Sequence, residues 1–294
     1  MKSYQGKTVY ITGGSSGIGL AAAKQFAGAG ANVAIISRDQ KKLDAALPAI
    51  QAAKATDGQK FLAVQLDVGN HTDVDAKMTA TARSFGTPDV LINCAGGVWC
   101  NYIEQTPYEA YEQEMRTNFF GVRNMVTALM PFMKERGGNI VNVSSTLGFV
   151  GVFGYAAYVP SKFAIIGFSE VIRAELKQHN IRVSILCPPD TDTPQLAEEN
   201  LTKPPETRAI SGNAGLLQPE QAAAAMIKGM ERNRFMIVPG FMNKVSWLAK
   251  RWVPGLLFSF MDSDAKKAQA KMGSGGQWSK GSGQNPRTPE PRNP

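Results

Sequence analysis

The sequence predicts an α/β fold, a doubly wound parallel sheet of about seven strands with helices on both faces. Strand-like and helical segments alternate along the first 240 of the 294 residues, and the strand-like segments are nearly continuous apolar runs. Such runs are typical of parallel strands that are buried on both faces. Because crossovers between parallel strands are right-handed, the connecting helices cover both sides of the sheet. A chain of this length can bury about three quarters of its surface in one large core.

Each strand-like segment is short and is followed by a turn or a helical stretch. Residues 7–12 are rich in β-branched side chains, which favour strands. Strands are expected at 7–12, 31–37, 61–68, 88–96, 139–145, 181–188 and 234–239. Helices are expected at 20–30, 38–55, 72–85, 109–136 and 158–179. This arrangement is of the Rossmann type, in which ligands bind at the carboxyl ends of the strands.

Residues 1–240 are predicted to form this domain, and the sequence pattern changes after them. In the segment 241–272, apolar side chains from Phe241 to Trp252 recur at helical intervals, with basic residues between them. Such an amphipathic segment can lie on a membrane surface, cover a pocket or form a dimer contact, and the sequence leaves all three alternatives open. Residues 273–294 are rich in Gly, Ser and Pro and are predicted to be a disordered tail.

Composition and charge argue against several classes of protein. The 32 basic and 24 acidic residues give a net charge of +8, but the basic residues are scattered, so no nucleic-acid partner is expected. No apolar stretch approaches the roughly 18–20 residues of a membrane-spanning helix, and the first strand starts too early for a signal peptide. Three cysteines are too few for a disulfide framework, so we expect a cytoplasmic location. The two distant histidines, His71 and His179, favour neither a zinc site nor a Ser-His-Asp triad, and no metal is expected.

A glycine-rich turn joins the first predicted strand to the first predicted helix. Gly13, Gly17 and Gly19 have the spacing G-x-x-x-G-x-G, which lets the backbone turn tightly and approach a pyrophosphate. The start of the helix adds N–H donors and the positive end of the helix dipole. A turn without a ligand is the alternative, but the position between strand and helix favours a dinucleotide. The candidate cofactor-binding residues in this turn are Gly13, Ser15, Ser16, Gly17, Ile18 and Gly19.

The residues after the second strand indicate which dinucleotide to expect. NAD sites place an acidic residue there for the ribose 2′-hydroxyl, whereas NADP sites place a cation there for the 2′-phosphate. Arg38 can form a planar fork on a phosphate and Lys42 adds a point charge, although the intervening Asp39 favours the other cofactor. We therefore predict NADPH rather than NADH. Further candidate cofactor contacts at the carboxyl ends of strands are Asp67, Val68 and Asn93.

Ser145, Tyr158 and Lys162 form the candidate catalytic set, and Tyr158 and Lys162 are also candidate cofactor contacts. Tyr158 and Lys162 are four residues apart, so they share one face of a helix, although this spacing alone also fits a surface pair. Lowering a tyrosine pKa from about 10 to about 7 takes about 4 kcal/mol, which the lysine and a cationic nicotinamide can supply together. Tyr158 can then protonate a carbonyl oxygen to which Ser145 donates a hydrogen bond.

Taken in order, these motifs resemble those of the short-chain dehydrogenase/reductase family. TGGSSGIG, the Asn-Cys-Ala-Gly turn, NFFG, NVSS and YVPSK follow the family's order within residues 5–240. The resemblance implies that Asn118 completes a catalytic tetrad by holding a water that relays protons through Lys162. It also implies a homo-oligomer.

The sequence departs from the family pattern at two positions. Cys94 stands where the family usually has a second asparagine, which is a modest change. Pro160 lies between Tyr158 and Lys162 and is compatible with their geometry if the helix starts near Ala157.

The loop after the sixth strand, PPDTDTP, is similar to that of the 3-ketodihydrosphingosine reductases, which reduce 3-ketosphinganine to sphinganine. The similarity implies a lipid ketone with an ammonium group beside its carbonyl, which Asp190 or Asp192 can recognise, unless these side chains only cap the loop backbone. The alternatives are a reductase of 3-oxoacyl or steroid ketones and, outside enzymes, an NADP(H)-sensing protein. Because a lipid substrate resides in a bilayer, we expect residues 241–261 to make a reversible, peripheral membrane contact on the cytoplasmic face.

Overall fold

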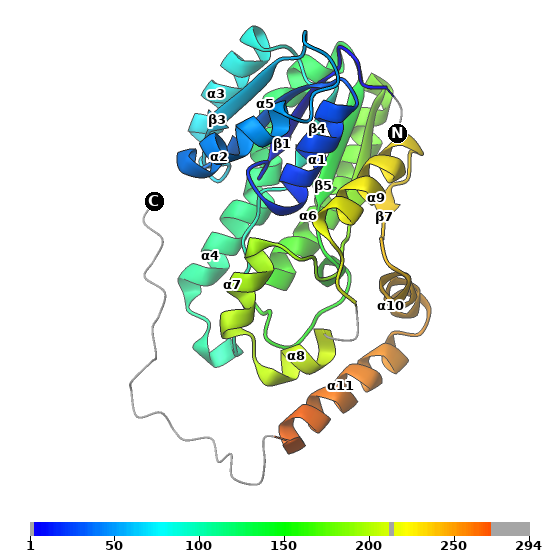
Figure 1. The fold of residues 1–294 in the computed structure, drawn as a ribbon. Helices are drawn as coiled ribbons and strands as arrows, with labels where there is room; N and C mark the ends of the chain where they lie inside the picture. Colours follow the sequence, from blue (N-terminus) through cyan, green and yellow to red (C-terminus); the bar gives the residue numbers. More distant parts are fainter. Residues whose placement is uncertain (1–2, 212–214, 272–294) are drawn as a thin grey trace.

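The chain forms three layers, a parallel sheet between two layers of helices, in a computed structural model that describes residues 3–211 and 215–271 (Figure 1). Seven strands pair in the order β3-β2-β1-β4-β5-β6-β7, and every pairing is parallel. The strands are β1 (Thr8–Thr12), β2 (Asn32–Ser37), β3 (Phe61–Gln65), β4 (Val90–Asn93), β5 (Gly138–Val143), β6 (Ile181–Leu186) and β7 (Met236–Ile237). The predicted fold class is confirmed, and the strand order reverses between β1 and β4, where such sheets bind ligands.

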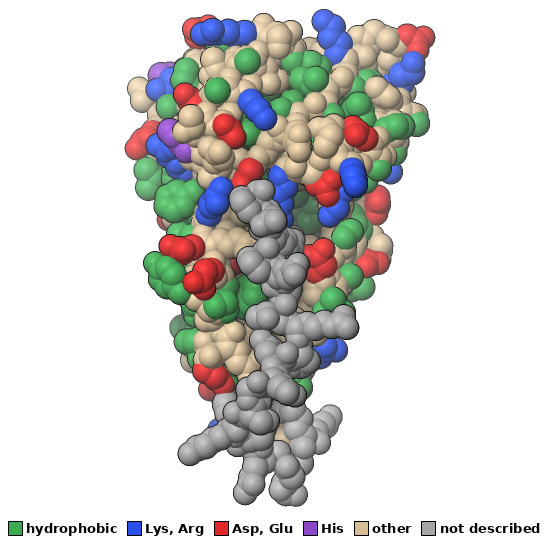
Figure 2. All heavy atoms as spheres, turned by 90° about the vertical axis from the view of Figure 1, so that its left-hand side faces the viewer, with side chains coloured by type: hydrophobic (Ala, Val, Ile, Leu, Met, Phe, Trp, Pro, Cys, Tyr) green, Lys and Arg blue, Asp and Glu red, His purple; other side chains and the backbone are tan. Residues whose placement is uncertain are grey.

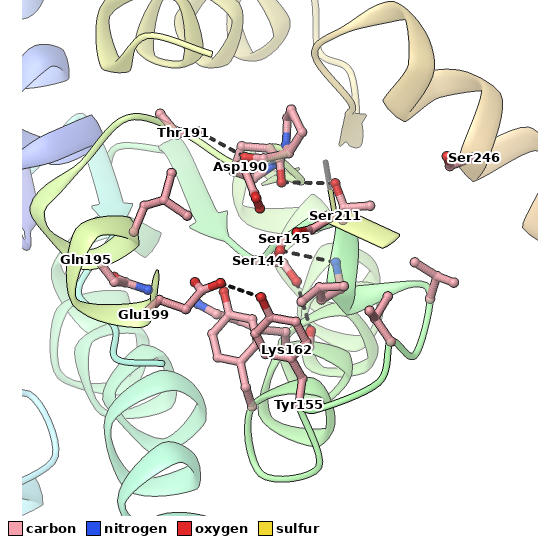
Figure 3. Close-up of a pocket in the computed structure, with 18 of the residues that line it drawn as sticks. Ser144, Ser145, Tyr155, Lys162, Asp190, Thr191, Gln195, Glu199, Ser211 and Ser246 are labelled. Carbon is pink, nitrogen blue, oxygen red and sulfur yellow. Dashed lines mark hydrogen bonds between the residues drawn. The ribbon is translucent and has the colours of Figure 1, made fainter. Parts of the chain in front are cut away.

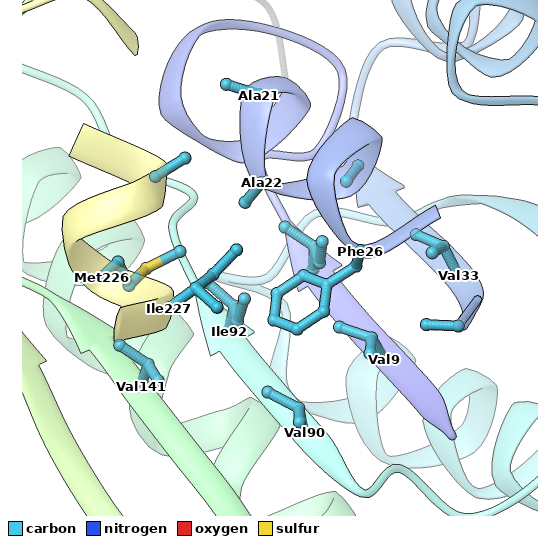
Figure 4. Packing of buried hydrophobic residues seen from close by; sticks show 14 of the residues in the cluster. Val9, Ala21, Ala22, Phe26, Val33, Val90, Ile92, Val141, Met226 and Ile227 are labelled. Atoms are coloured by element: carbon cyan, nitrogen blue, oxygen red, sulfur yellow. The ribbon is translucent and has the colours of Figure 1, made fainter. Parts of the chain in front are cut away.

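Helices cover both faces of the sheet, as the continuous apolar runs predict. One face carries α1 (Gly17–Gly28), α2 (Gln40–Gln51) and α9 (Pro219–Glu231). There Phe26 and Met226 share a core cluster with Val9 and Ile92 of the sheet (Figure 4). The other face carries α3 (His71–Ser84), α5 (Gly121–Lys134) and α6 (Tyr158–Leu176). Since each such buried side chain contributes about 1.5–3 kcal/mol, the two clusters hold the sheet rigidly under the site.

The helix predicted at 109–136 contains a change of helical type. It consists of α4 (Tyr108–Glu114), the π-helical turn η2 (Met115–Phe120) and α5. Asn118 lies in η2 and is fully buried. Single π-helical turns inside α-helices are rare and are frequently found at functional sites.

Four helices gather beyond the carboxyl ends of the strands, in the lower part of Figure 1. They are α7 (Pro194–Thr202), α8 (Pro205–Ser211), α10 (Phe241–Trp252) and α11 (Pro254–Lys271). α10 confirms the amphipathic helix predicted there, whereas α7, α8, α9 and α11 are not among the predicted helices. The pair Pro254-Gly255, which resembles a helix break, belongs to the first turn of α11. A proline costs no helix hydrogen bond at that position. The predicted disordered tail, 273–294, lies outside the described residues.

The helices α10 and α11 present large apolar side chains to the outside. Phe241, Trp252 and Phe260 are 78%, 74% and 64% exposed. Within the described ranges, no helix combines the length and apolar character needed to cross a bilayer. On the visible part of the face in Figure 2, basic and acidic side chains are interspersed.

Candidate active site

The glycine turn after β1 is bent so tightly that added side chains would collide with their neighbours. Gly13 and Gly17 have φ angles of +66° and +51°, in the left-handed region that favours glycine. A β-carbon on Gly13 would lie 2.9 Å from the backbone nitrogen of Ala95, and one on Gly19 would collide with the carbonyl oxygen of Gly13. The turn therefore keeps bare backbone beside the start of α1, as a phosphate-binding turn requires.

The start of α1 opens into a large cavity at the carboxyl end of the sheet. Gly13, Ser16, Gly17 and Ile18 line this cavity, whereas Ser15 and Gly19 are not among its lining residues. Ser16 is the N-cap of α1, and within the described chain its hydroxyl makes no capping hydrogen bond. Its hydroxyl and the first N–H groups of α1 are thus available to an anion.

Basic and acidic residues follow β2. Arg38 and Lys42 are both exposed. Asp39 is the N-cap of α2, where its carboxylate accepts a hydrogen bond from the backbone nitrogen of Lys42 at 3.1 Å. A carboxylate at a helix start is stabilised by the helix dipole, so Asp39 has a structural role that does not require a ribose.

Asp67, Val68 and Asn93 do not line the cavity. Asp67 pairs with Arg116 at 3.3 Å, and Val68 is buried. The side chain of Asn93 is also buried, and its Nδ2 donates to Oδ1 of Asn142 at 2.8 Å. Its Oδ1 has no hydrogen-bond partner among the described residues. Their cofactor contacts remain predictions, and the observed contacts of all three are with the protein.

Ser145, Tyr158 and Lys162 lie together on one wall of the cavity, where Figure 3 shows Ser145 and Lys162 among the lining side chains. Ser145 follows β5, and Tyr158 and Lys162 lie on the first turns of α6. The Nζ atom of Lys162 lies 5.4 Å from the centre of the Tyr158 ring and donates to the carbonyl oxygen of Val143 at 3.3 Å. The structure therefore brings the three predicted residues to one place.

Pro160 does not disturb this arrangement. α6 begins at Tyr158 with Ala157 as its N-cap, so Pro160 is the third residue of the helix. The first N–H groups of a helix have no intrahelical partner, and the missing N–H of proline is tolerated there. The condition that the helix starts near Ala157 is therefore met.

Asn118 and Lys162 both lie close to Gly96, the last residue of the Asn-Cys-Ala-Gly turn. A β-carbon on Gly96 would lie 2.9 Å from Oδ1 of Asn118 and 3.4 Å from Nζ of Lys162. Oδ1 of Asn118 accepts from the backbone nitrogen of Gly97 at 2.9 Å, and its Nδ2 donates to Glu114 at 2.6 Å. The side chain thus ties η2 to the turn, and its part in a water relay remains a prediction.

Burial dominates the electrostatics of the catalytic set. It raises the pKa of Tyr158, the negative charge of Glu199 raises it further, and a hydrogen bond with Ser145 offsets part of the effect. Burial lowers the pKa of Lys162, although the charge of Glu114 opposes this. The protein groups around Tyr158 therefore do not by themselves lower its pKa as expected, and its hydroxyl stays protonated.

The cavity has a volume of about 650 Å³ and combines polar and apolar walls. Its polar wall includes the glycine turn and the catalytic set. Part of its apolar wall comes from the two C-terminal helices, which contribute Met242, Val245, Ala249, Leu256, Leu257, Phe260 and Met261. The segment after residue 240 is therefore part of the site.

A charged cluster lies near the catalytic set. Asp190 lines the cavity, whereas Asp192 is exposed and is not among the lining residues. Nζ of Lys203 lies 3.5 Å from Asp190 and 2.6 Å from Glu199. Glu199 also accepts a hydrogen bond from the hydroxyl of Tyr155, as Figure 3 shows. The sequence analysis misses Glu199 and Lys203, although their spacing of four residues is that of a helical ion pair.

The pKa shifts in this cluster follow from burial and charge. Burial raises the pKa of Asp190 despite the nearby ammonium of Lys203. Burial alone would lower the pKa of Lys203, but the hydrogen bond with Glu199 and the charge of Asp190 leave it raised. Lys203 is thus charged at neutral pH. No group of three or more His, Cys, Asp or Glu side chains in the described ranges is arranged to hold a metal ion.

Comparisons with known proteins agree with this geometry. Residues 7–204 match the family model described as short chain dehydrogenase. The chain is 39% identical over 232 residues to a 3-dehydrosphinganine reductase of Danio rerio, covering 78% of this chain and 70% of that protein. It is 35% identical over 273 residues to a 3-ketodihydrosphingosine reductase of Dictyostelium discoideum, covering 88% and 82%. A short chain dehydrogenase/reductase of Burkholderia phymatum, solved in complex with NAD, has the same fold, with a TM-score of 0.73, 23% identity and coverage of 85% and 94%.

Proposed function

The chain belongs to the short chain dehydrogenase family, and on this premise we propose that it reduces the lipid ketone 3-ketosphinganine to sphinganine with NADPH. The observation that carries the proposal is the cavity. It joins the glycine turn, a buried tyrosine–lysine pair and an apolar wall in one space. A lipid ketone reductase needs these three features together. The hydride donor and the proton donor must both reach the carbonyl group, while the alkyl chain attached to that group lies against an apolar surface.

The residues of the cavity and of the end of β2 fit NADPH. The bare backbone of Gly13 and Gly17 and the start of α1 would hold the pyrophosphate, and the exposed Arg38 and Lys42 would hold the 2′-phosphate. Asp39 caps α2 and does not compete for that position. When bound, NADPH supplies the hydride.

The proton comes from Tyr158. Burial keeps its hydroxyl protonated, which is the state that the reduction of a ketone requires. Ser145 would orient the carbonyl oxygen by a hydrogen bond, and Lys162 would stabilise the phenolate that forms when the proton leaves. Each of these residues lies on the wall of the same cavity.

The C-terminal helices fit the alkyl chain and a membrane surface. Leu257 and Phe260 of α11 and Val245 of α10 line the cavity, so an alkyl chain would lie between these helices. The same helices expose Phe241 and Trp252 beside basic residues, which is the composition of an interfacial helix. We therefore propose that the enzyme binds membranes peripherally and takes its substrate from them.

The test is NADPH oxidation by the purified chain with 3-ketosphinganine. Tyr158→Phe should lower kcat/KM by about 10²- to 10⁴-fold, because the general acid is lost. Tyr108→Phe removes the hydroxyl of an exposed residue that does not line the cavity, and it should leave the rate unchanged. Turnover of a 3-oxoacyl or steroid ketone without turnover of 3-ketosphinganine would contradict the proposed substrate.

A further inference from the structure

Two carboxylates of the cavity wall meet one buried ammonium group. Glu199 on α7 and Asp190 in the loop after β6 both line it and both face Lys203. The three formal charges sum to one negative charge. Tyr155 does not change this sum, because burial raises its pKa and keeps its hydroxyl neutral. The cluster therefore has an excess of negative charge in a site where the side chain of Glu199 is only 10% exposed.

The protein contacts of this cluster use only one oxygen of each carboxylate. The hydroxyl of Tyr155 and Nζ of Lys203 both contact Oε1 of Glu199, and Lys203 contacts Oδ2 of Asp190. In the described part of the chain, no side-chain hydrogen bond or ion pair reaches Oε2 of Glu199 or Oδ1 of Asp190. Both carboxylates line the cavity, and a free carboxylate oxygen there can accept a charge-assisted hydrogen bond, so a cationic ligand with several N–H donors would be stabilised here.

We propose that Glu199 and Asp190 bind the ammonium group of a long-chain 2-amino-3-ketone. This inference rests on the proposed function and adds the residues that recognise the polar end of the substrate. A primary ammonium has three donors, enough to reach the free oxygen of each carboxylate. Because the ammonium is attached to the carbon next to the carbonyl, its position at Glu199 fixes the carbonyl near the catalytic tyrosine.

Binding of this group would also help the proton transfer. The negative charge of Glu199 is the largest electrostatic cause, after burial, of the raised pKa of Tyr158. An ammonium group at Glu199 neutralises that charge and stabilises the phenolate. An amino ketone would thus be favoured in the chemical step as well as in binding, whereas a ketone without the amine would not.

The experiment compares 3-ketosphinganine with its des-amino analogue, a ketone of the same chain length, in NADPH oxidation. Wild-type chain, Glu199→Gln and the control Glu198→Gln are measured. Gln keeps an acceptor for Tyr155 and Lys203, and Glu198 is the exposed neighbour on the same helix. The wild type should prefer the amino ketone by about 10- to 100-fold in kcat/KM, and Glu199→Gln should remove most of this preference. Glu198→Gln should keep the preference within about twofold.

Three outcomes bear on the two proposals separately. A wild type that reduces neither ketone overturns the proposed function itself. A wild type that reduces both ketones equally well overturns only the ammonium subsite, and this result does not depend on the folding of any variant. If Glu199→Gln lowers kcat/KM equally for both ketones and keeps the wild-type preference, Glu199 has a structural role and does not belong to the subsite.

Discussion

Replacing Lys203 by methionine should destabilise the folded chain by about 3 kcal/mol at pH 7. The side chain of Lys203 is 3% exposed, and its Nζ lies 2.6 Å from Glu199 and 3.5 Å from Asp190. Removing one partner of a buried ion pair costs about 3–5 kcal/mol, because the remaining charge loses its compensation. The lower end applies here, since Tyr155 still donates to Glu199 and since Asp190, with 35% of its side chain exposed, is screened by water.

Thermal unfolding at pH 7 and pH 5 measures this effect. In a chain of this size, about 3 kcal/mol corresponds to a decrease in Tm of about 6 °C. In the variant, Asp190 loses the ammonium group that opposes the effect of burial on its pKa, so the folded state binds a proton there more readily than the unfolded chain does. The stability deficit of the variant therefore shrinks as the pH falls. Lys60→Met, at an exposed lysine, is the control. A decrease below about 2 °C at pH 7, or an equal decrease at both pH values, would refute the reasoning.

Three further predictions concern the cofactor and the membrane. Gly19→Ala should weaken NADPH binding by about tenfold or more in a fluorescence titration, because its β-carbon collides with the carbonyl oxygen of Gly13; unchanged affinity would show that the turn can relax. Arg38→Ala should lower kcat/KM for NADPH by about tenfold and leave that for NADH nearly unchanged, whereas equal use of both cofactors by the wild type would contradict the NADPH assignment. The double variant Phe241→Ser, Trp252→Ser should lose sedimentation with anionic vesicles while keeping its Tm, and identical sedimentation would exclude α10 from the contact.

The sheet could be predicted from the sequence because each strand is specified locally. Apolar runs such as 31–37 consist of residues that favour a buried strand, and the parallel pairing follows from the alternation of strands with helices. The helices beyond the sheet were harder to predict, because their starts resemble loops. α7 begins at Thr193-Pro194 and α11 at Pro254, where the proline occupies a first helical turn and does not end a helix.

That the candidate catalytic residues lie together could be predicted for a similar reason. Tyr158 and Lys162 are four residues apart on one helix, so their neighbourhood is fixed by local geometry. The four-residue spacing of Glu199 and Lys203 indicates an ion pair but not its place in the site. The relation of Glu199 to Tyr155 and Asp190 depends on how the loop after β6 folds over the cavity. The apolar wall from α10 and α11 is likewise a product of tertiary packing, which neither helix specifies alone.

The raised pKa of Tyr158 is consistent with a reductase when the charges around it are considered together. A protonated tyrosine is ready to give a proton, but burial and the charge of Glu199 oppose the phenolate that remains. Lys162 is itself weakened as a counterion, since burial lowers its pKa. The missing stabilisation must therefore enter with the ligands, and an amino ketone brings a positive charge to the very carboxylate that opposes the reaction. If this account is correct, the advantage of the amino ketone should appear in kcat as well as in KM, and an advantage confined to KM would limit Glu199 to binding.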